Sequence, residues 1–282
     1  MSSDPARPAE RLAVIGDPVD HSLSPAMQGA ALAAAGLPWT YGAKRVAPAD
    51  LAEEVGRLRA TMRGFNITIP HKVAIRNHVD EIAPSAARVG AVNTVVRSGR
   101  RLIGHNTDLA GFTAALIALE PAPSGTAVLF GAGGAARAVA LALADRDLPL
   151  VIVNRSLDRA LGLAHSVPGA RALRLDDREV RQCLGTAGVV VNATSLGLRA
   201  ADPSPLPPGA RLRPDGVVMD LVYGHRTAFL RTAHRCGCRA TDGVEMLVRQ
   251  GAESFRLWTG IDPDLDVMRA ACRRQLEEAR AC

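Results

Sequence analysis

A short glycine-rich turn at residues 131–136 constrains the fold of this chain more than any other feature. An apolar run at residues 127–130 ends at Gly131, and a stretch rich in alanine and leucine starts directly after the turn. The spacing Gly131-x-Gly133-x-x-Ala136, between a strand and a helix, is typical of dinucleotide-binding folds. Gly131 permits a tight turn, and the missing Cβ of Gly133 lets a pyrophosphate approach the helix N-terminus. The turn therefore predicts a nucleotide site.

The end of the next predicted strand indicates which dinucleotide binds. Residues 150–153 form an apolar run that is followed by Asn154, Arg155 and Ser156, with Arg159 close behind. An NAD site usually has a carboxylate here for the ribose 2′-hydroxyl, whereas an NADP site needs cations for the 2′-phosphate. The two arginines and the serine hydroxyl favour NADP. The alternative interpretation is a helix start with Ser156 as N-cap and two solvated arginines.

Strands and helices alternate beyond the glycine turn, which predicts a doubly wound parallel sheet of the Rossmann type. The expected strands are 127–130, 150–153, 189–191, 217–221 and 238–240, and the five prolines between 202 and 214 predict a surface loop. Ligands bind at the carboxyl ends of such strands. The expected cofactor-binding residues are Gly131, Gly133, Gly134, Ala135, Asn154, Arg155, Ser156, Arg159, Thr194, Ser195 and Gly243.

Length and composition limit the classes of protein. The 282 residues are enough for two domains with separate cores. The net charge is +6, but the basic residues are scattered and only 3% of residues are aromatic, which fits small anions better than nucleic acid. No apolar run is long enough for a membrane span, and residues 1–10 lack a signal-peptide core.

The cysteines indicate a reducing, cytoplasmic compartment. There are five, an odd number, and they follow no disulfide or zinc spacing. The nearest approach to a metal motif is His234-x-Cys236-x-Cys238, on a predicted helix end and turn. No metal site is expected.

The loop after the first predicted strand, 11–16, contains two serines before a helix that we expect from residue 26 to about 35. Ser22 and Ser24 could hold a carboxylate with their hydroxyls and the free N–H groups of the helix start. Ser24 as N-cap, with Pro25 at the first helical position, is an equally good interpretation.

Further candidates follow a strand predicted at 64–70. Lys72 stands where this strand should give way to a helix, which directs its amine toward the carboxyl end of the sheet. The alternative interpretation is a solvated lysine at a helix start. Ser98-Gly99 predicts a hairpin turn between two apolar runs. Asp108 starts a helix predicted over 109–120, where it also suits the helix dipole, and residues 121–125 read as a domain boundary.

Two helices, over 243–255 and 264–280, follow the completed nucleotide repeat, and their apolar faces need a partner. We expect them to return to the first domain. The predicted domains are thus 1–109 with 243–282, and 110–242. We expect the site in a cleft between them, with hinges near 109–125 and 240–243 and with Gln250 near Lys72 or Asp108.

Short segments spread along nearly the whole chain resemble the shikimate 5-dehydrogenases, of the shikimate/quinate dehydrogenase family. They are residues 21–25 (HSLSP), 66–72 (NITIPHK), 91–95 (AVNTV), 106–112 (NTDLAGF), 131–135 (GAGGA), 154–156 (NRS), 192–195 (NATS), 220–223 (DLVY) and 250–255 (QGAESF). The chain departs from the family pattern at Gln28-Gly29, where His-Asn is frequent, and at His225, where Pro is common.

The resemblance implies an α/β fold with an N-terminal substrate domain and a Rossmann NADP domain. It implies reversible NADPH reduction of 3-dehydroshikimate to shikimate, a step toward chorismate and the aromatic amino acids. We expect a monomer or homodimer. Lys72 and Asp108 would be the catalytic pair. The residues that would bind substrate are Ser22, Ser24, Thr68, Lys72, Asn93, Asp108, Tyr223 and Gln250, the serines and the tyrosine taking the carboxylate.

Two alternatives compete with this interpretation. One is a quinate/shikimate dehydrogenase that accepts quinate or prefers NAD; its NAD-using members should carry an acid near 154–156, where this chain has Asn-Arg-Ser. A ligand sensor that has kept the fold and lost turnover should lack a catalytic residue, but Lys72, Asn93 and Asp108 are all present.

Overall fold

The computed structural model describes residues 9–119 and 124–281. The chain divides into two compact units, one of Met1–Thr107 with Leu247–Cys282 and one of Asp108–Met246. The predicted divisions, after residues 109 and 242, lie two and four residues from these positions. The leader at 1–8, the expected helix end at 120 and most of the boundary at 121–125 lie outside the described residues.

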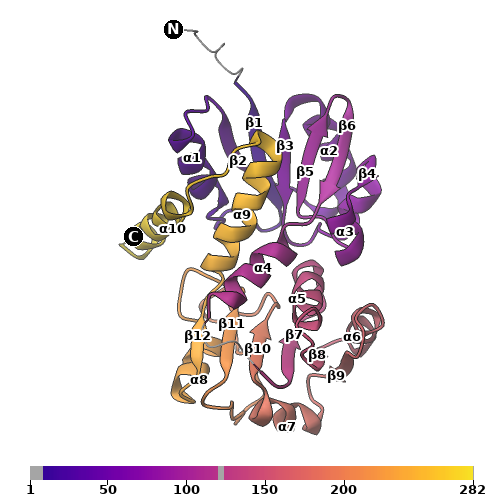
Figure 1. Cartoon of the computed structure of the whole chain (residues 1–282), viewed down its shortest axis with the longest axis vertical. Coiled ribbons are helices and arrows are strands. Elements are labelled where there is room, and N and C mark those ends of the chain that lie inside the picture. Colours follow the sequence, from indigo (N-terminus) through magenta and orange to yellow (C-terminus); the bar gives the residue numbers. More distant parts are fainter. Residues whose placement is uncertain (1–8, 120–123, 282) are drawn as a thin grey trace. The chain divides into compact units, whose positions relative to one another are not determined.

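The first unit is built on a six-stranded mixed sheet in the order β2-β1-β3-β5-β6-β4 (Figure 1). Its strands are β1 (Arg11–Gly16), β2 (Thr40–Arg45), β3 (Gly64–Ile67), β4 (Glu81–Ile82), β5 (Thr94–Ser98) and β6 (Arg101–His105). Strands β1, β2 and β3 are parallel, while β5 runs antiparallel to both β3 and β6. The predicted hairpin is confirmed, because Ser98 pairs with Arg101 and Gly99 has a φ of 60°.

Helices from both ends of the sequence belong to the first unit. They are α1 (Ser24–Ala34), α2 (Leu51–Thr61), α3 (Pro84–Val89), α10 (Leu265–Ala281) and all but the first turn of α9 (Val244–Thr259), with the 3-10 helices η1 (Pro48–Asp50) and η2 (Ala74–His78). The C-terminal helices α9 and α10 therefore pack with elements more than 100 residues earlier, α9 with β5 and α10 with α1. Trp258 of α9 donates its indole N–H to the carbonyl oxygen of Val95.

The second unit holds a six-stranded sheet in the order β12-β11-β10-β7-β8-β9, with every pair parallel. Its strands are β7 (Ala127–Phe130), β8 (Leu150–Asn154), β9 (Arg171–Arg174), β10 (Val189–Asn192), β11 (Val217–Asp220) and β12 (Arg239–Thr241). Its helices are α4 (Asp108–Ile117), α5 (Gly134–Ala144), α6 (Leu157–Ala164), α7 (Arg178–Thr186) and α8 (Ala228–Arg235). The strand order is that of a Rossmann fold, and the direction of winding reverses between β7 and β10.

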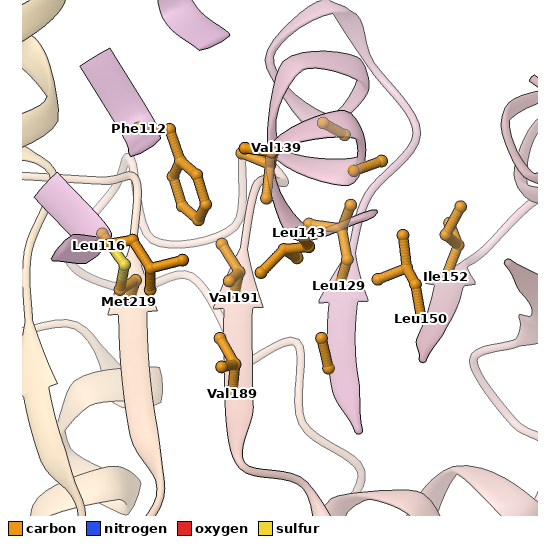
Figure 2. Close-up of a cluster of buried hydrophobic side chains, with 14 of the residues drawn as sticks. Phe112, Leu116, Leu129, Val139, Leu143, Leu150, Ile152, Val189, Val191 and Met219 are labelled. Carbon is orange, nitrogen blue, oxygen red and sulfur yellow. The ribbon is translucent and has the colours of Figure 1, made fainter. Parts of the chain in front are cut away.

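Alternate residues of these strands supply a core on each face of the sheet. Figure 2 shows one face, on which Phe112 and Leu116 of α4 and Val139 and Leu143 of α5 cover Val191 and its neighbours. The opposite face carries a second buried cluster that includes Val128, Val151, Val190, Leu184 and Phe229. Both faces of the sheet are thus buried.

One strand of the second unit was not predicted by the sequence analysis. β9 consists of Arg171, Ala172, Leu173 and Arg174, none of them β-branched or aromatic, and it lies at the sheet edge with both arginines exposed. Its conformation comes from pairing with β8 and from packing, more than from local preference. In the parts of the chain that the structure describes, no helix is both long and apolar enough to cross a membrane.

Candidate active site

The two candidate serines follow β1, at the edge of the first sheet where the parallel strands β1 and β3 both end. The backbone N–H of Ser24 donates to the Ser22 hydroxyl at 3.2 Å. Helix α1 has Leu23 as its N-cap and no side-chain cap, so the N-cap interpretation of Ser24 is wrong. The Ser22 hydroxyl covers a helix N–H instead, and Ser24, 7% exposed, is the first helical residue.

Lys72 lies in a turn that several long-range hydrogen bonds fix. Strand β3 ends at Ile67, and a 3-10 helix follows Lys72 where an α-helix was expected. The buried His71 ring bonds to the carbonyl oxygen of Val46 at 2.7 Å, and the Val92 N–H donates to the Lys72 carbonyl at 2.7 Å. The backbone of Lys72 is therefore held beside the segment that carries Asn93, while its side chain remains partly exposed.

Thr68 lies at the same edge. Its N–H donates to the Ile15 carbonyl at 2.9 Å, and a Cβ added at Gly16 would collide with the Thr68 methyl group. Gly16 is thus needed for the close approach of the β1 and β3 ends. Thr68 itself is partly exposed.

Asn93 and Gln250 meet although 157 residues separate them. The Asn93 side chain is 2% exposed and donates from Nδ2 to Gln250 Oε1 at 3.2 Å. Gln250 lies on α9 and is partly exposed. The structure therefore brings four candidates from three segments, Thr68 and Lys72, Asn93, and Gln250, to one part of the first unit.

A buried layer of hydroxyl and amide groups supports these candidates, and the sequence analysis assigned it no role. Ser254, fully buried, bonds to Asn66 Nδ2 at 3.1 Å, to Thr94 Oγ1 at 2.7 Å and to Thr107 Oγ1 at 3.2 Å. The available signal was the spacing of Ser254, four residues after Gln250 and thus on the same helix face.

Asp108 and Tyr223 belong to the second unit. Asp108 is the first residue of α4 and is 2% exposed. Tyr223 follows β11 and is partly exposed.

The glycine turn lies in the second unit, where the winding of the sheet reverses. Gly131 has a φ of 110°, and a Cβ there would come within 2.8 Å of the Ala193 carbonyl oxygen. Gly133 is the N-cap of α5, and a Cβ there would meet no atom within 4 Å. Gly131 is thus required by the fold, whereas Gly133 leaves open space at a helix N-terminus, as a bound phosphate requires.

The residues that follow β8 supply positive charge, and residues 154–156 include no carboxylate. The Ser156 hydroxyl accepts the Arg159 N–H at 3.5 Å as N-cap of α6, and Asn154 Nδ2 donates to the Ser156 carbonyl at 2.9 Å. The Arg155 and Arg159 side chains are exposed and form no ion pair with any residue in 9–119 or 124–281. The helix-cap interpretation of Ser156 is confirmed, and it leaves both arginines accessible to an anion.

Polar groups also follow β10. The Thr194 hydroxyl donates to Asn192 Oδ1 at 2.7 Å and accepts the Leu196 N–H at 3.1 Å. Thr194 therefore shapes its own loop, and the neighbouring Ser195 is exposed.

The end of β11 is packed tightly. A Cβ added at Gly243 would collide with the Leu221 carbonyl oxygen, so Gly243 allows this approach.

Burial raises the pKa of the Asp220 carboxyl, although Thr227, the Val222 N–H and Asn192 all donate hydrogen bonds to it.

The predicted absence of metal ligands can be compared with the geometry. Within the described ranges, no group of three His, Cys, Asp or Glu side chains is arranged to hold a metal ion. The described cysteines, Cys183, Cys236, Cys238 and Cys272, are free thiols. Burial raises the pKa of Cys238 to about 11 and that of Cys272 to about 11.

Three family models match the chain. Residues 14–95 match the shikimate dehydrogenase substrate binding domain, residues 114–200 match shikimate / quinate 5-dehydrogenase, and residues 243–273 match the shikimate 5′-dehydrogenase C-terminal domain.

Individual proteins are similar over nearly the full length. The NADP(+) shikimate dehydrogenase of Moorella thermoacetica is 45% identical over 275 residues, which cover 94% of this chain and 93% of that protein. The crystal structure of Thermus thermophilus shikimate 5-dehydrogenase with NADP(H) and shikimate has a TM-score of 0.85 at 43% identity, covering 94% and 99% of the two chains. The quinate dehydrogenase of Corynebacterium glutamicum in complex with NAD has a TM-score of 0.83 at 32% identity, covering 93% and 98%.

Proposed function

This chain belongs to the shikimate dehydrogenase family, and we propose that it catalyses the reversible NADPH-dependent reduction of 3-dehydroshikimate to shikimate. It is an NADP-dependent oxidoreductase that acts on a CH–OH group. The observation that carries the proposal is the convergence of Thr68, Lys72, Asn93 and Gln250 in the first unit. The reaction supplies an intermediate for aromatic amino acid synthesis.

The first unit supplies groups suited to a polyhydroxylated carboxylic acid. Ser22 and Ser24, with Tyr223 of the second unit, would hold the carboxylate through hydroxyl groups. Thr68, Asn93 and Gln250 would hold the ring hydroxyls, since a side-chain amide both donates and accepts hydrogen bonds.

Lys72 and Asp108 are the proposed catalytic pair. When a ketone is reduced, negative charge develops on its oxygen, and a nearby ammonium group stabilises that charge and donates a proton. Lys72, in the turn that follows β3, would supply this amine. Asp108 would orient that amine and bind a ring hydroxyl.

The glycine turn and the arginines after β8, both in the second unit, are suited to binding NADP. Bound NADPH would supply the hydride. The open space at Gly133 and the N-terminus of α5 would receive the pyrophosphate, together with the Gly134 and Ala135 N–H groups. Arg155 and Arg159 would bind the 2′-phosphate, and no carboxylate lies at residues 154–156 to favour NAD. Gly243, Thr194 and Ser195 border the same edge of the sheet and complete the proposed contacts.

We propose a cytoplasmic location, in line with five cysteines that follow no disulfide spacing. A monomer or homodimer without nucleic acid fits the proposed reaction.

A steady-state assay that crosses shikimate and quinate with NADP and NAD tests the assignment. We expect the highest kcat/KM with shikimate and NADP. A higher value with quinate would move the chain to quinate dehydrogenases, and a higher value with NAD would contradict the role of Arg155 and Arg159. If the folded protein turned over no combination of substrate and cofactor, the result would favour a non-catalytic ligand sensor.

A further inference from the structure

The side-chain amides of Asn93 and Gln250 meet with a defined polarity. Asn93 Oδ1 accepts the Thr107 N–H at 2.8 Å and the Thr94 hydroxyl at 3.1 Å. A backbone N–H can only donate, so this contact fixes which amide atom is the oxygen. Asn93 Nδ2 consequently points to Thr107 Oγ1 at 2.8 Å and to Gln250 Oε1 at 3.2 Å.

Gln250 is oriented in the complementary sense. Its Nε2 donates to the Leu247 carbonyl, one turn earlier on α9, at 2.9 Å. Its Oε1 therefore faces Asn93 and also lies 3.4 Å from Thr107 Oγ1. The two amides present one donor and one acceptor to each other.

Thr107 is the residue that contacts both amides. Its N–H holds the Asn93 oxygen, and its hydroxyl accepts from the Asn93 nitrogen and lies beside the Gln250 oxygen. Thr107 is 4% exposed, and Ser254 Oγ supports its hydroxyl from behind at 3.2 Å. Thr107 thus cannot turn away without breaking several buried hydrogen bonds, and each costs more to leave unmade than it contributes when formed.

We propose that Thr107 is a positioning residue that sets the polarity of the Asn93–Gln250 pair and so makes the site selective for a hydroxyl group of the substrate. This inference rests on the proposed function. A hydroxyl accepts and donates at once, so it can enter between Asn93 Nδ2 and Gln250 Oε1 and replace their direct bond. That bond, at 3.2 Å, is longer than the other three hydrogen bonds described above for the Asn93 amide. An oxo group cannot do the same, because it only accepts.

The test compares three variants by steady-state kinetics in the direction of shikimate oxidation. Thr107→Val has nearly the same shape, keeps the N–H and removes only the hydroxyl. We expect it to raise the KM for shikimate roughly tenfold and to leave the KM for NADP unchanged, with kcat within about threefold. Thr107→Ser keeps the hydroxyl and should restore the KM for shikimate to within about twofold.

Ser254→Ala is the matched control, because Ser254 belongs to the same buried layer but bonds to neither side-chain amide of the pair. It should lower the melting temperature and leave the KM for shikimate within about twofold. Should Thr107→Val fail to fold, Thr107→Cys replaces the hydroxyl with a weak acceptor, and it too should raise this KM.

The outcomes separate the two proposals. If the wild type is active but the folded Thr107→Val and Thr107→Cys variants have the wild-type KM for shikimate, the positioning role is overturned and the proposed function is left intact. An equal rise of KM in Ser254→Ala also overturns it, since general loosening would then explain the effect. A wild type without shikimate turnover overturns both.

Discussion

The indole N–H of Trp258 donates to the carbonyl oxygen of Val95 at 2.9 Å, joining α9 to β5 across 163 residues of sequence. Trp258 is 1% exposed, and its ring occupies the space where Gly64 lacks a side chain. This contact attaches the helix that carries Gln250 to the strand that directly follows Asn93.

Replacing Trp258 with Phe should destabilise the protein. The variant removes the buried N–H and part of the ring, so we expect a loss of about 2–4 kcal/mol in the free energy of unfolding. Urea denaturation measures it. Trp39→Phe, at a partly exposed tryptophan, is the control and should change stability by less than about 1 kcal/mol. If both variants lost the same free energy of unfolding, the hydrogen bond from Trp258 to Val95 would not contribute specifically to stability.

Lys72→Ala should lower kcat by several orders of magnitude and leave the KM for shikimate within about tenfold, because the interaction grows as charge develops on oxygen. The chain contains only two lysines, Lys44 and Lys72. Lys44→Ala is therefore the natural control, since Lys44 pairs with Glu54 at 2.7 Å and should be dispensable for turnover. A Lys72→Ala enzyme with near-native kcat would reduce Lys72 to a binding residue.

The scarcity of lysine permits a chemical test of the same assignment. In Lys44→Arg, Lys72 is the only remaining lysine, so an amine-acylating reagent can modify Lys72 and the chain N-terminus alone. We expect inactivation that shikimate slows. Full activity after complete acylation of Lys72 would exclude it from the reaction.

Replacing both Arg155 and Arg159 with Ala should weaken NADP binding selectively, by roughly 1.5–3 kcal/mol for each charged hydrogen bond lost. NAD lacks the 2′-phosphate and should be little affected. The paired control is Arg231→Ala with Arg235→Ala, which removes the same charge from exposed positions on α8. An equal loss for NAD and NADP would mean that the loop after β8 is structural.

The two glycines of the turn should respond differently to alanine. Gly131→Ala places a Cβ 2.8 Å from the Ala193 carbonyl oxygen at a φ of 110°, so the melting temperature should fall. Gly133→Ala meets no protein atom within 4 Å, so the fold should persist while the Kd for NADP rises, as titration of protein fluorescence would show. Unchanged NADP affinity in Gly133→Ala would remove Gly133 from the cofactor contacts.

His105 should make stability depend on pH. Burial lowers its pKa below the usual 6.5, so the folded chain leaves it neutral in a range where the unfolded chain protonates it. Its contribution to stability is therefore complete above about pH 6.5 and falls as the pH drops toward the lower folded pKa. His105→Gln should flatten the unfolding free energy in that range, measured against His165→Gln at an exposed histidine. If the free energy of unfolding depended on pH equally in both variants, His105 would not be the source of this dependence.

Local signals in the sequence were sufficient for much of the fold. The glycine turn at Gly131 and the Ser98-Gly99 hairpin were predictable because each depends on backbone conformations that few residues adopt. β9 was not, because Arg171 to Arg174 form a strand only through pairing with β8. The 3-10 helix after Lys72 likewise depends on distant bonds, such as that from Val92 to the Lys72 carbonyl.

The candidate site was predictable to the extent that its residues stand in recognisable short segments. The family motifs were sufficient to identify Lys72, Asn93 and Gln250. They do not identify the side chains that orient these three residues. Thr107 and Ser254 act through contacts with residues far away in the sequence, and only the folded chain reveals these contacts.

The division of the chain also sets an order of synthesis. The second unit is one continuous segment, Asp108–Met246, placed between the two parts of the first. A ribosome therefore releases everything that the Rossmann unit needs before it has made α9 and α10. Until then the nascent first unit lacks Trp258 for Val95 and Ser254 for Asn66 and Thr94, so the packing of its sheet is completed only after α9 has been translated.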